Sequence, residues 1–142
     1  MTSAVAEFSW NPDLVIEEFL YLAEETLVIT CINVALYAKV DPPYKTGRYQ
    51  RSIRVIEPGY EGDDTADATT EDLLTTDIEQ LREEIVDGHL AVGSFISYAY
   101  SVQVNAKNPD QRYNIQQAVD AKGTQEDYDY NLHIVKSKYG VH

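Results

Sequence analysis

The residues that most often carry chemistry are few and widely spaced in this sequence. The histidines are His89, His133 and His142, and no two of them have the spacing of a metal site on a helix or strand. The single cysteine, Cys31, falls in the middle of an apolar helical pattern, which predicts a buried structural thiol rather than a nucleophile. The serines at 94, 97 and 101 lack the glycine-flanked elbow of a hydrolase.

Acidic pairs and loops are the next candidates for chemistry. Asp63-Asp64 and Glu83-Glu84 could act as acid and base, but solvated surface charge is the more ordinary role for such pairs. The stretch EGDDTADATTED has oxygen ligands at alternate positions without the pattern of a calcium loop. YKTGRYQ has one glycine and is therefore no glycine-rich phosphate loop. We accordingly expect no enzyme, no cofactor and no metal.

A basic segment, PPYKTGRYQRSIRV (42–55), is the first unusual feature. It holds Lys45, Arg48, Arg51 and Arg54, four of the eleven cationic side chains of the protein. The segment could be a nucleic-acid contact, a phosphate cradle or a piece of scaffold with a basic face. In the scaffold interpretation Thr46 caps a helical turn, Gly47 relieves crowding, and Tyr49 and Ile53 face inward. The arginines then spread over the solvent side.

Overall charge and composition limit the possible classes of function. The 142 residues carry a formal net charge of -13, which disfavours wrapping DNA or an anionic membrane. Twelve acids against Arg82 alone lie between Glu57 and Asp87, either as a solvated face or as a surface that keeps DNA from sticking. The start of the sequence lacks the pattern of a signal peptide, and the run LVITCINVALYA looks too short and too polar to span a bilayer. With one cysteine, these features predict a cytosolic-type protein without disulfides.

The elements that must position these residues form an α+β pattern in a single domain over 1–142. NPDLVIEEFLYLAEETLVITCINVALYAKV (11–40) predicts one long helix that starts at Asn11 and Pro12 and stops before Pro42. Its apolar stripe is Ile16, Leu20, Ala23, Leu27, Cys31, Val34 and Ala38. From Leu27 onward the apolar arc broadens, so that half of the helix is predicted to be buried on more than one side, by its own domain or by a neighbouring copy.

The rest of the chain predicts a small antiparallel sheet and further helices. SIRVIEP predicts a short strand, and TEDLLTTDIEQLREEIVDG a second helix with Thr70 as its cap and Leu74, Ile78, Leu81 and Ile85 as its stripe. HLAVGSFISYAYSVQVNA has strand composition, with a turn at Gly93-Ser94 and with Tyr98, Tyr100, Val102 and Val104 on one face. The last helix is capped by Thr124 and carries Tyr128, Leu132, Val135 and Tyr139.

Two segments resemble a known signature. In the first, a proline is followed by Thr46-Gly47-Arg48, a hydrophobe, Arg51 and Ser52-Ile53; in the second, Val92-Gly93 is followed by Tyr98-Ala99 and Val102. In this order, after a long helix, they resemble the tail-completion (head–tail joining) proteins of long-tailed phages. Gln103 and Asn105 depart from the family pattern, which often has an acid and a glycine there, and the acidic segment 57–88 is an insertion between the two motifs.

The resemblance implies a structural virion protein that forms a ring of six or twelve copies at the neck or tail top, in contact with neighbouring connector or tail proteins. DNA would pass nearby without sequence-specific binding, and the protein would reach the virion from the host cytoplasm. For the arginines of the basic segment we favour contact with protein over contact with DNA, with a solvated face as a third alternative. The rival function is a small acidic cytosolic module that mimics DNA charge to mask a basic partner.

Overall fold

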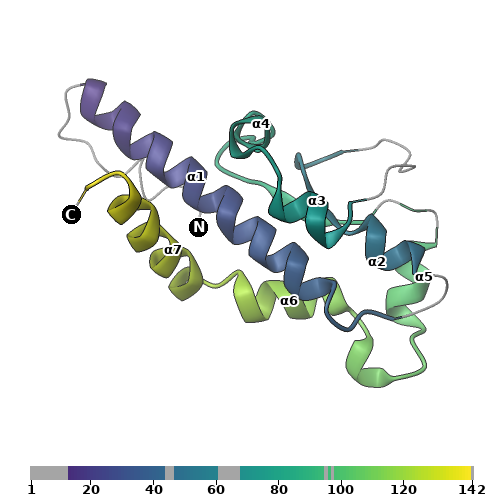
Figure 1. Cartoon of the computed structure of the whole chain (residues 1–142). Helices are drawn as coiled ribbons and strands as arrows, with labels where there is room; N and C mark the ends of the chain where they lie inside the picture. The colour runs from purple at the N-terminus through teal and green to yellow at the C-terminus, as the bar shows by residue number, and fades with distance from the viewer. Residues whose placement is uncertain (1–12, 44–46, 61–67, 95, 97, 142) are drawn as a thin grey trace.

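The structure is a computed structural model that describes residues 13–43, 47–60, 68–94, 96 and 98–141. It confirms the α+β fold, with a long N-terminal helix, a two-stranded antiparallel sheet and further helices in the middle and at the C-terminal end (Figure 1). The elements in chain order are α1 (Asp13–Ala38), α2 (Arg48–Ser52), β1 (Arg54–Ile56), α3 (Thr70–Leu74), α4 (Ile78–Arg82), β2 (Ala91–Gly93), α5 (Ala99–Val104), a 3₁₀ turn (Pro109–Gln111), α6 (Asn114–Lys122) and α7 (Gln125–Lys138).

Helix α1 is the central element of the fold. The helices α6 and α7 pack along one side of it, and α3, α4 and the sheet lie on the other (Figure 1). Val28 and Ala35 are fully buried between these layers. The predicted broad apolar arc is therefore covered by the protein's own domain on both sides.

The predicted stripe of α1 is only partly correct. Leu27, Cys31, Val34 and Ala38 are buried as expected, whereas Leu20 is 46% exposed. Ile16 and the N-terminal signals at Asn11 and Pro12 lie outside the residues whose side chains the structure describes. The helix ends at Ala38, four residues before the first proline of the Pro42-Pro43 pair.

Two buried threonines on α1 show how a long apolar helix tolerates polar groups. The Thr26 hydroxyl donates to the carbonyl of Leu22 at 2.6 Å, and the Thr30 hydroxyl donates to the carbonyl of Thr26 at 2.8 Å. A hydroxyl bonded to the preceding turn is satisfied without water, so both side chains can be buried.

The segment Phe19–Ala38 of α1 is long and apolar enough to cross a membrane by length and composition. The run LVITCINVALYA is part of this longer apolar segment, so the expectation that the region is too short and too polar to span a bilayer was wrong on those two criteria. Half of the segment is buried inside the protein, and the core helix of a soluble protein has the same composition. The absence of a membrane partner stays a prediction.

The sheet joins β1 to β2 in an antiparallel pair with the register Arg54↔Gly93, Val55↔Val92 and Ile56↔Ala91. The predicted strand at SIRVIEP is thus confirmed, with Ile53 and Val55 buried. Ile56 is buried as well, and both strands contact α1.

The predicted single helix over 70–87 is wrong, because the structure has two short helices there. Thr69, not Thr70, caps α3 through a reciprocal capping box with Asp72, and Asp77 caps α4. Between them Thr75 and Thr76 turn their hydroxyls back to the carbonyls of the last turn. Leu73 is buried and Leu74 is 68% exposed, so the apolar face also differs from the predicted stripe by one residue.

The prediction of strand throughout 89–106 is also wrong. Among the residues of this stretch that the structure describes, Ala91–Gly93 is strand and residues 99–104 form helix α5. Tyr98, Ala99 and Val102 pack against the core at helical spacing, whereas Tyr100 is 76% exposed. Packing has overridden the preference of tyrosine and valine for strands.

The C-terminal helix is confirmed. Thr124 caps α7 in a capping box with Asp127, and Tyr128 and Val135 are buried as predicted, while Tyr139 stays 44% exposed. Helix α6, which precedes it, was not predicted. Its apolar stripe is short, and its contact with α1 depends on the small Ala118, which is fully buried.

Candidate interaction surface

The basic segment folds in part as the scaffold interpretation predicts: the inward residues are confirmed, but of the three arginines only Arg51 is on the solvent side. Gly47 precedes α2 in the left-handed region with φ 80°, a conformation that glycine adopts without strain. Tyr49 and Ile53 are buried in the core, while Arg51 is exposed and Arg48 and Arg54 are half-buried. The guanidinium of Arg54 lies over the ring of Tyr60 at 5.1 Å. Thr46 and Lys45 lie outside the described residues.

The structure brings the two motif segments together. Arg54, which directly follows Ser52-Ile53, pairs with Gly93 across the sheet. The hydroxyls of Ser52 and Ser94 lie 2.5 Å apart, and the Ser52 hydroxyl also donates to the carbonyl of Tyr49 at 2.6 Å. Ile53 and Ala99 belong to the same buried cluster, against which Tyr98 packs. Of the predicted motif residues, Ser52, Ile53, Gly93, Tyr98 and Ala99 thus form one structural unit.

Sequence reasoning missed Lys39 as part of this unit. Lys39 is 4% exposed, and its ammonium donates to the carbonyl of Gln50 at 2.6 Å and to the carbonyl of Ala68. The Gln50 amide donates back to the carbonyl of Lys39 at 2.5 Å. The available signal was position: Lys39 is the first basic residue of the sequence and follows the last turn of a long apolar helix, where a cation suits the helix dipole.

A second missed residue, Asn114, connects the motif to the C-terminal half. The buried Tyr49 hydroxyl donates to Oδ1 of Asn114 at 2.7 Å, and the amide of Asn114 donates to the carbonyl of Ala38 at 3.2 Å. Burial raises the pKa of Tyr49, so this hydroxyl keeps its proton and acts as a donor. Helices α1, α2 and α6 are thereby joined at one point.

The described residues contain no group of three or more His, Cys, Asp or Glu side chains that could hold a metal ion. Cys31 is buried, and burial raises the pKa of its thiol to about 12, so the thiol remains protonated at neutral pH. His89 and His133 are exposed on the surface. Among the described residues neither Cys31 nor the two histidines form a pair of nucleophile and base. The candidate functional sites that remain are therefore surfaces of the protein.

The acidic segment is attached to α1 through Arg82. Its guanidinium contacts Glu24 on α1 at 2.9 Å and Glu79 on α4 at 2.8 Å, and it lies 4.0 Å from the ring centre of Tyr21. Tyr21 also donates to Glu79 at 2.7 Å. Hydrogen bonds with Tyr139 and Glu79 raise the pKa of Tyr21, and the bond from Tyr21 lowers the pKa of Glu79. Arg82, the single cation of residues 57–87, therefore serves to fix α4, and the outer face of the segment stays anionic.

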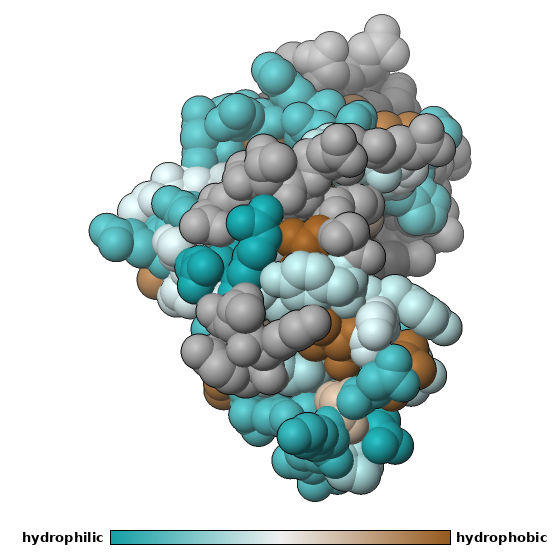
Figure 2. Space-filling model, turned by 90° about the vertical axis from the view of Figure 1, so that its right-hand side faces the viewer, coloured by the Kyte–Doolittle hydropathy of each residue, from teal (hydrophilic) through white to brown (hydrophobic). Residues whose placement is uncertain are grey.

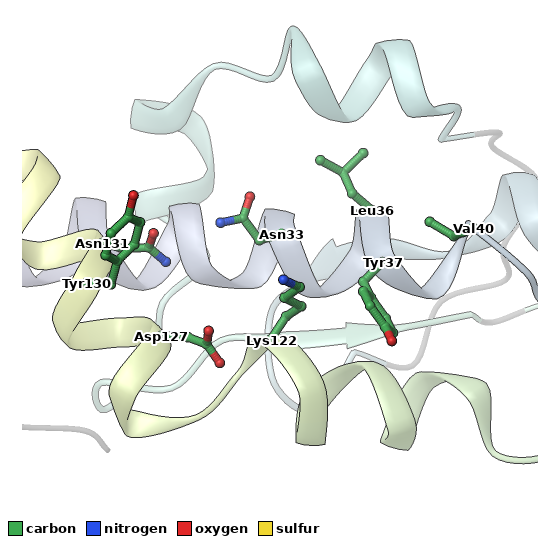
Figure 3. A pocket seen from close by; sticks show the side chains of 8 residues that line it. All are labelled: Asn33, Leu36, Tyr37, Val40, Lys122, Asp127, Tyr130 and Asn131. Atoms are coloured by element: carbon green, nitrogen blue, oxygen red, sulfur yellow. The ribbon is translucent and has the colours of Figure 1, made fainter.

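A groove of about 360 Å³ lies between the end of α1 and the junction of α6 with α7 (Figure 3). We call it the α1–α7 groove. Its lining comes from α1, from the turn that follows α1, and from α6 and α7: Asn33, Leu36 and Tyr37 of α1, Val40 of the turn, Lys122 of α6, and Asp127, Tyr130 and Asn131 of α7. Figure 3 shows Tyr37 extending from α1 and Lys122 extending toward α1 beside it, and the ammonium lies 5.9 Å from the ring centre of Tyr37. Val40 and Tyr130 are 78% and 66% exposed, so apolar and aromatic side chains stand at the surface beside the charged Lys122 and Asp127.

The end of the molecule formed by α2 and α5 has a different surface. Seen from that side, small hydrophobic patches are separated by hydrophilic surface (Figure 2). A second hollow there, of about 410 Å³, is lined by Pro43, Tyr98, Val102 and Ala106 among others. The motif residue Tyr98 thus contributes to both the core and this surface.

Comparisons of the chain with protein-family models, with curated proteins and with solved structures found no match.

Proposed function

We propose that this protein is a structural virion protein of a tailed phage that acts in tail completion and head–tail joining, as one subunit of an oligomeric neck ring around the DNA channel. The observation that carries the proposal is the meeting of the two motif segments. Ser52-Ile53 and Gly93-Ser94 are about forty residues apart in sequence, yet they are joined by the β1–β2 pairing and by the Ser52–Ser94 contact. If the chain shares the fold of the family, the two parts of the family signature should lie together in space, and these two segments do.

The distribution of charge supports the same proposal. The exposed acids of α3 and α4 would repel the DNA backbone within roughly 10 Å at physiological salt, so a channel lined by them would let DNA pass without binding it. Arg51 is exposed beside the start of α3, where it lines a hollow together with Glu71, and it would contact acidic groups of a neighbouring subunit or connector.

The test is to delete the gene from its phage genome and to examine the particles by electron microscopy. The proposal expects filled heads and separate tails that do not join. Normal infectious particles would contradict it, and so would a source genome without phage head and tail genes.

Complementation then assigns the basic surface. Arg51→Glu is expected to impair head–tail joining if Arg51 contacts a neighbouring protein, and Lys107→Glu, an exposed charge reversal in the loop after α5, serves as the control. If Arg51 instead contacts DNA, the variant particles should assemble but retain less DNA.

The rival function, a DNA mimic, has one structural observation in its favour. Glu71, Asp72, Asp77, Glu79 and Glu83 are all exposed on α3–α4 and the turn that follows. A mimic would bind a basic partner as a monomer or dimer, and salt would weaken that binding. A neck protein would join a symmetric ring, so the stoichiometry of the complex distinguishes the two functions.

A further inference from the structure

The α1–α7 groove is a candidate binding surface, and the charge of the protein limits what can bind in it. At a net charge of -13, two copies repel each other unless the surfaces that meet carry few acids. The groove is lined by Tyr37, Val40 and Tyr130, with one cation, Lys122, and one acid, Asp127, beside them. Because these two charges offset each other, an uncharged or weakly acidic segment of another copy could approach the groove without strong repulsion.

Residues 1–12, MTSAVAEFSWNP, are such a segment. They lie outside the residues that the structure describes and directly precede α1. Among their side chains only Glu7 is charged, and they include two aromatic anchors, Phe8 and Trp10. Aromatic side chains contribute large apolar area on docking and are common anchors in protein interfaces. A second ring beside Lys122 would share its cation–π contact with Tyr37.

The length of the segment shows whether it can bind the groove of its own chain or only that of another copy. Tyr37 lies 24 residues beyond Asp13 on α1, which corresponds to about 36 Å at 1.5 Å per residue. Trp10 precedes Asp13 by three residues and Phe8 by five, so even a fully extended chain carries them only about 11 Å and 18 Å. The aromatic anchors of one chain therefore cannot reach the groove at the far end of the same chain.

We propose that residues 1–12 of one copy, anchored by Phe8 and Trp10, bind in the α1–α7 groove of a second copy. The contact is head-to-tail, because the segment leaves one end of α1 and the groove lies at the other, and repeated head-to-tail contacts generate rings or filaments. The inference rests on the part of the proposed function in which copies assemble, and it does not depend on the phage role.

Two complementary variants test this contact in solution. The arm variant Phe8→Ser/Trp10→Ser keeps an intact groove and contains no tryptophan, since Trp10 is the only one in the chain. The groove variant Val40→Glu keeps its arm and places a charge at a side chain that is 78% exposed, so the monomer fold should tolerate it. Circular dichroism checks that both are folded, and Tyr100→Ser, an exposed change on α5, is the matched control.

Sedimentation gives the first result. Wild type and Tyr100→Ser should associate with rising concentration, each of the two variants alone should remain monomeric, and their equimolar mixture should form a dimer and nothing larger. The mixture has only one arm and one groove that can combine, which is why assembly stops there. A monomeric mixture, or an arm variant that assembles like wild type, overturns the proposal.

Tryptophan emission gives the second result. In the mixture Trp10 of the groove variant is the one tryptophan, so its emission can be excited selectively and should shift to shorter wavelength as the arm variant is added. If Trp10 of wild type is already shifted at every concentration and does not respond to mixing, the arm binds its own chain and the proposal is wrong. Failure of the phage deletion test with a positive mixing test would overturn the phage role alone.

Discussion

At the residue scale, the Tyr49 hydroxyl offers a clean test of what holds the motif in place. Replacing Tyr49 with Phe keeps the ring in the core and removes the proton donated to Asn114 over 2.7 Å. The Asn114 oxygen is then buried without that donor, which should lower the free energy of unfolding by about 1–3 kcal/mol. Urea unfolding followed by circular dichroism measures the change.

Tyr100→Phe is the matched control, because the same atom is removed from a side chain that is 76% exposed. Its effect should stay within about 0.5 kcal/mol. Equal effects of the two substitutions would show that the Tyr49–Asn114 bond contributes nothing net to stability.

Single residues differ in how well the sequence predicted them. Tyr49 and Ile53 were correctly placed inside, because they are apolar and four residues apart around one helical turn. Lys39 and Asn114 were not, because a polar side chain becomes buried only where partners distant in sequence satisfy it. Those partners, the carbonyls of Gln50 and Ala68 and the Tyr49 hydroxyl, are known only once the chain is folded.

At the scale of the element, two adjacent leucines test the register of α3. Leu73 is 5% exposed and Leu74 is 68% exposed, so the same substitution to alanine should have unequal effects. Leu73→Ala should cost about 2–5 kcal/mol through lost contacts and a cavity, and Leu74→Ala within about 0.5 kcal/mol. Thermal or urea unfolding of both variants measures the two losses of stability. A larger loss for Leu74→Ala than for Leu73→Ala would support the register that the sequence pattern predicted.

The helix pattern failed at α3 and α4 for a local reason. Apolar spacing alone fits one continuous helix, but Thr75, Thr76 and Asp77 are residues whose side chains bond to nearby backbone instead. Thr75 and Thr76 bond to the end of α3, and Asp77 accepts from the amide of Glu79 at the start of α4. The two threonines therefore end α3, and Asp77 starts α4 as its N-cap.

The capping box of α7 predicts a pH dependence. Hydrogen bonds from Thr124 hold the pKa of Asp127 below its usual value of 3.8 in the folded protein. A group whose pKa is lowered by folding stabilises fully above pH 3.8, and this contribution is lost as pH falls through the lower, folded-state pKa. Asp127→Asn should thus be less stable than wild type at pH 6, and the gap should close as pH falls below about 3.8.

Thr124→Ala checks the cause by removing the other half of the box. It should lower stability at neutral pH by about 1 kcal/mol, and its gap to wild type should also narrow in acid. Urea unfolding at several pH values measures both variants. A gap that stays constant down to pH 2 would exclude Asp127 as the titrating group.

At the scale of the whole molecule, α1 makes the protein one cooperative unit. Helices α3, α4, α6 and α7 and both strands contact α1, and no element pair away from it has comparable contact except the two strands. We therefore expect urea unfolding curves from far-ultraviolet circular dichroism, which reports helices, and from near-ultraviolet circular dichroism, which reports packed tyrosines, to coincide. Two separated transitions would show that the sheet and the acidic segment fold apart from α1, α6 and α7.

The fold class was predictable because its strongest signals are long. A 26-residue apolar helix and a capped C-terminal helix dominate the sequence pattern, and both were found where expected. Helices α5 and α6 were missed because they are short and are stabilised by contact with α1 and the core rather than by their own pattern. The α1–α7 groove could not be predicted at all, since its walls come from residues about ninety positions apart.

The pairing of Ile56 with Ala91 has a consequence for how such a gene can change. It places the two ends of the acidic segment on neighbouring strands, where a tight two-residue turn could close the same sheet. Additions and deletions between these positions would leave the strands and their register in place. Relatives of this chain should therefore differ in length mainly here, and those with a short turn should carry altered residues at Tyr21 and Glu24, which α4 would no longer cover, and on the core face that Leu73 covers here.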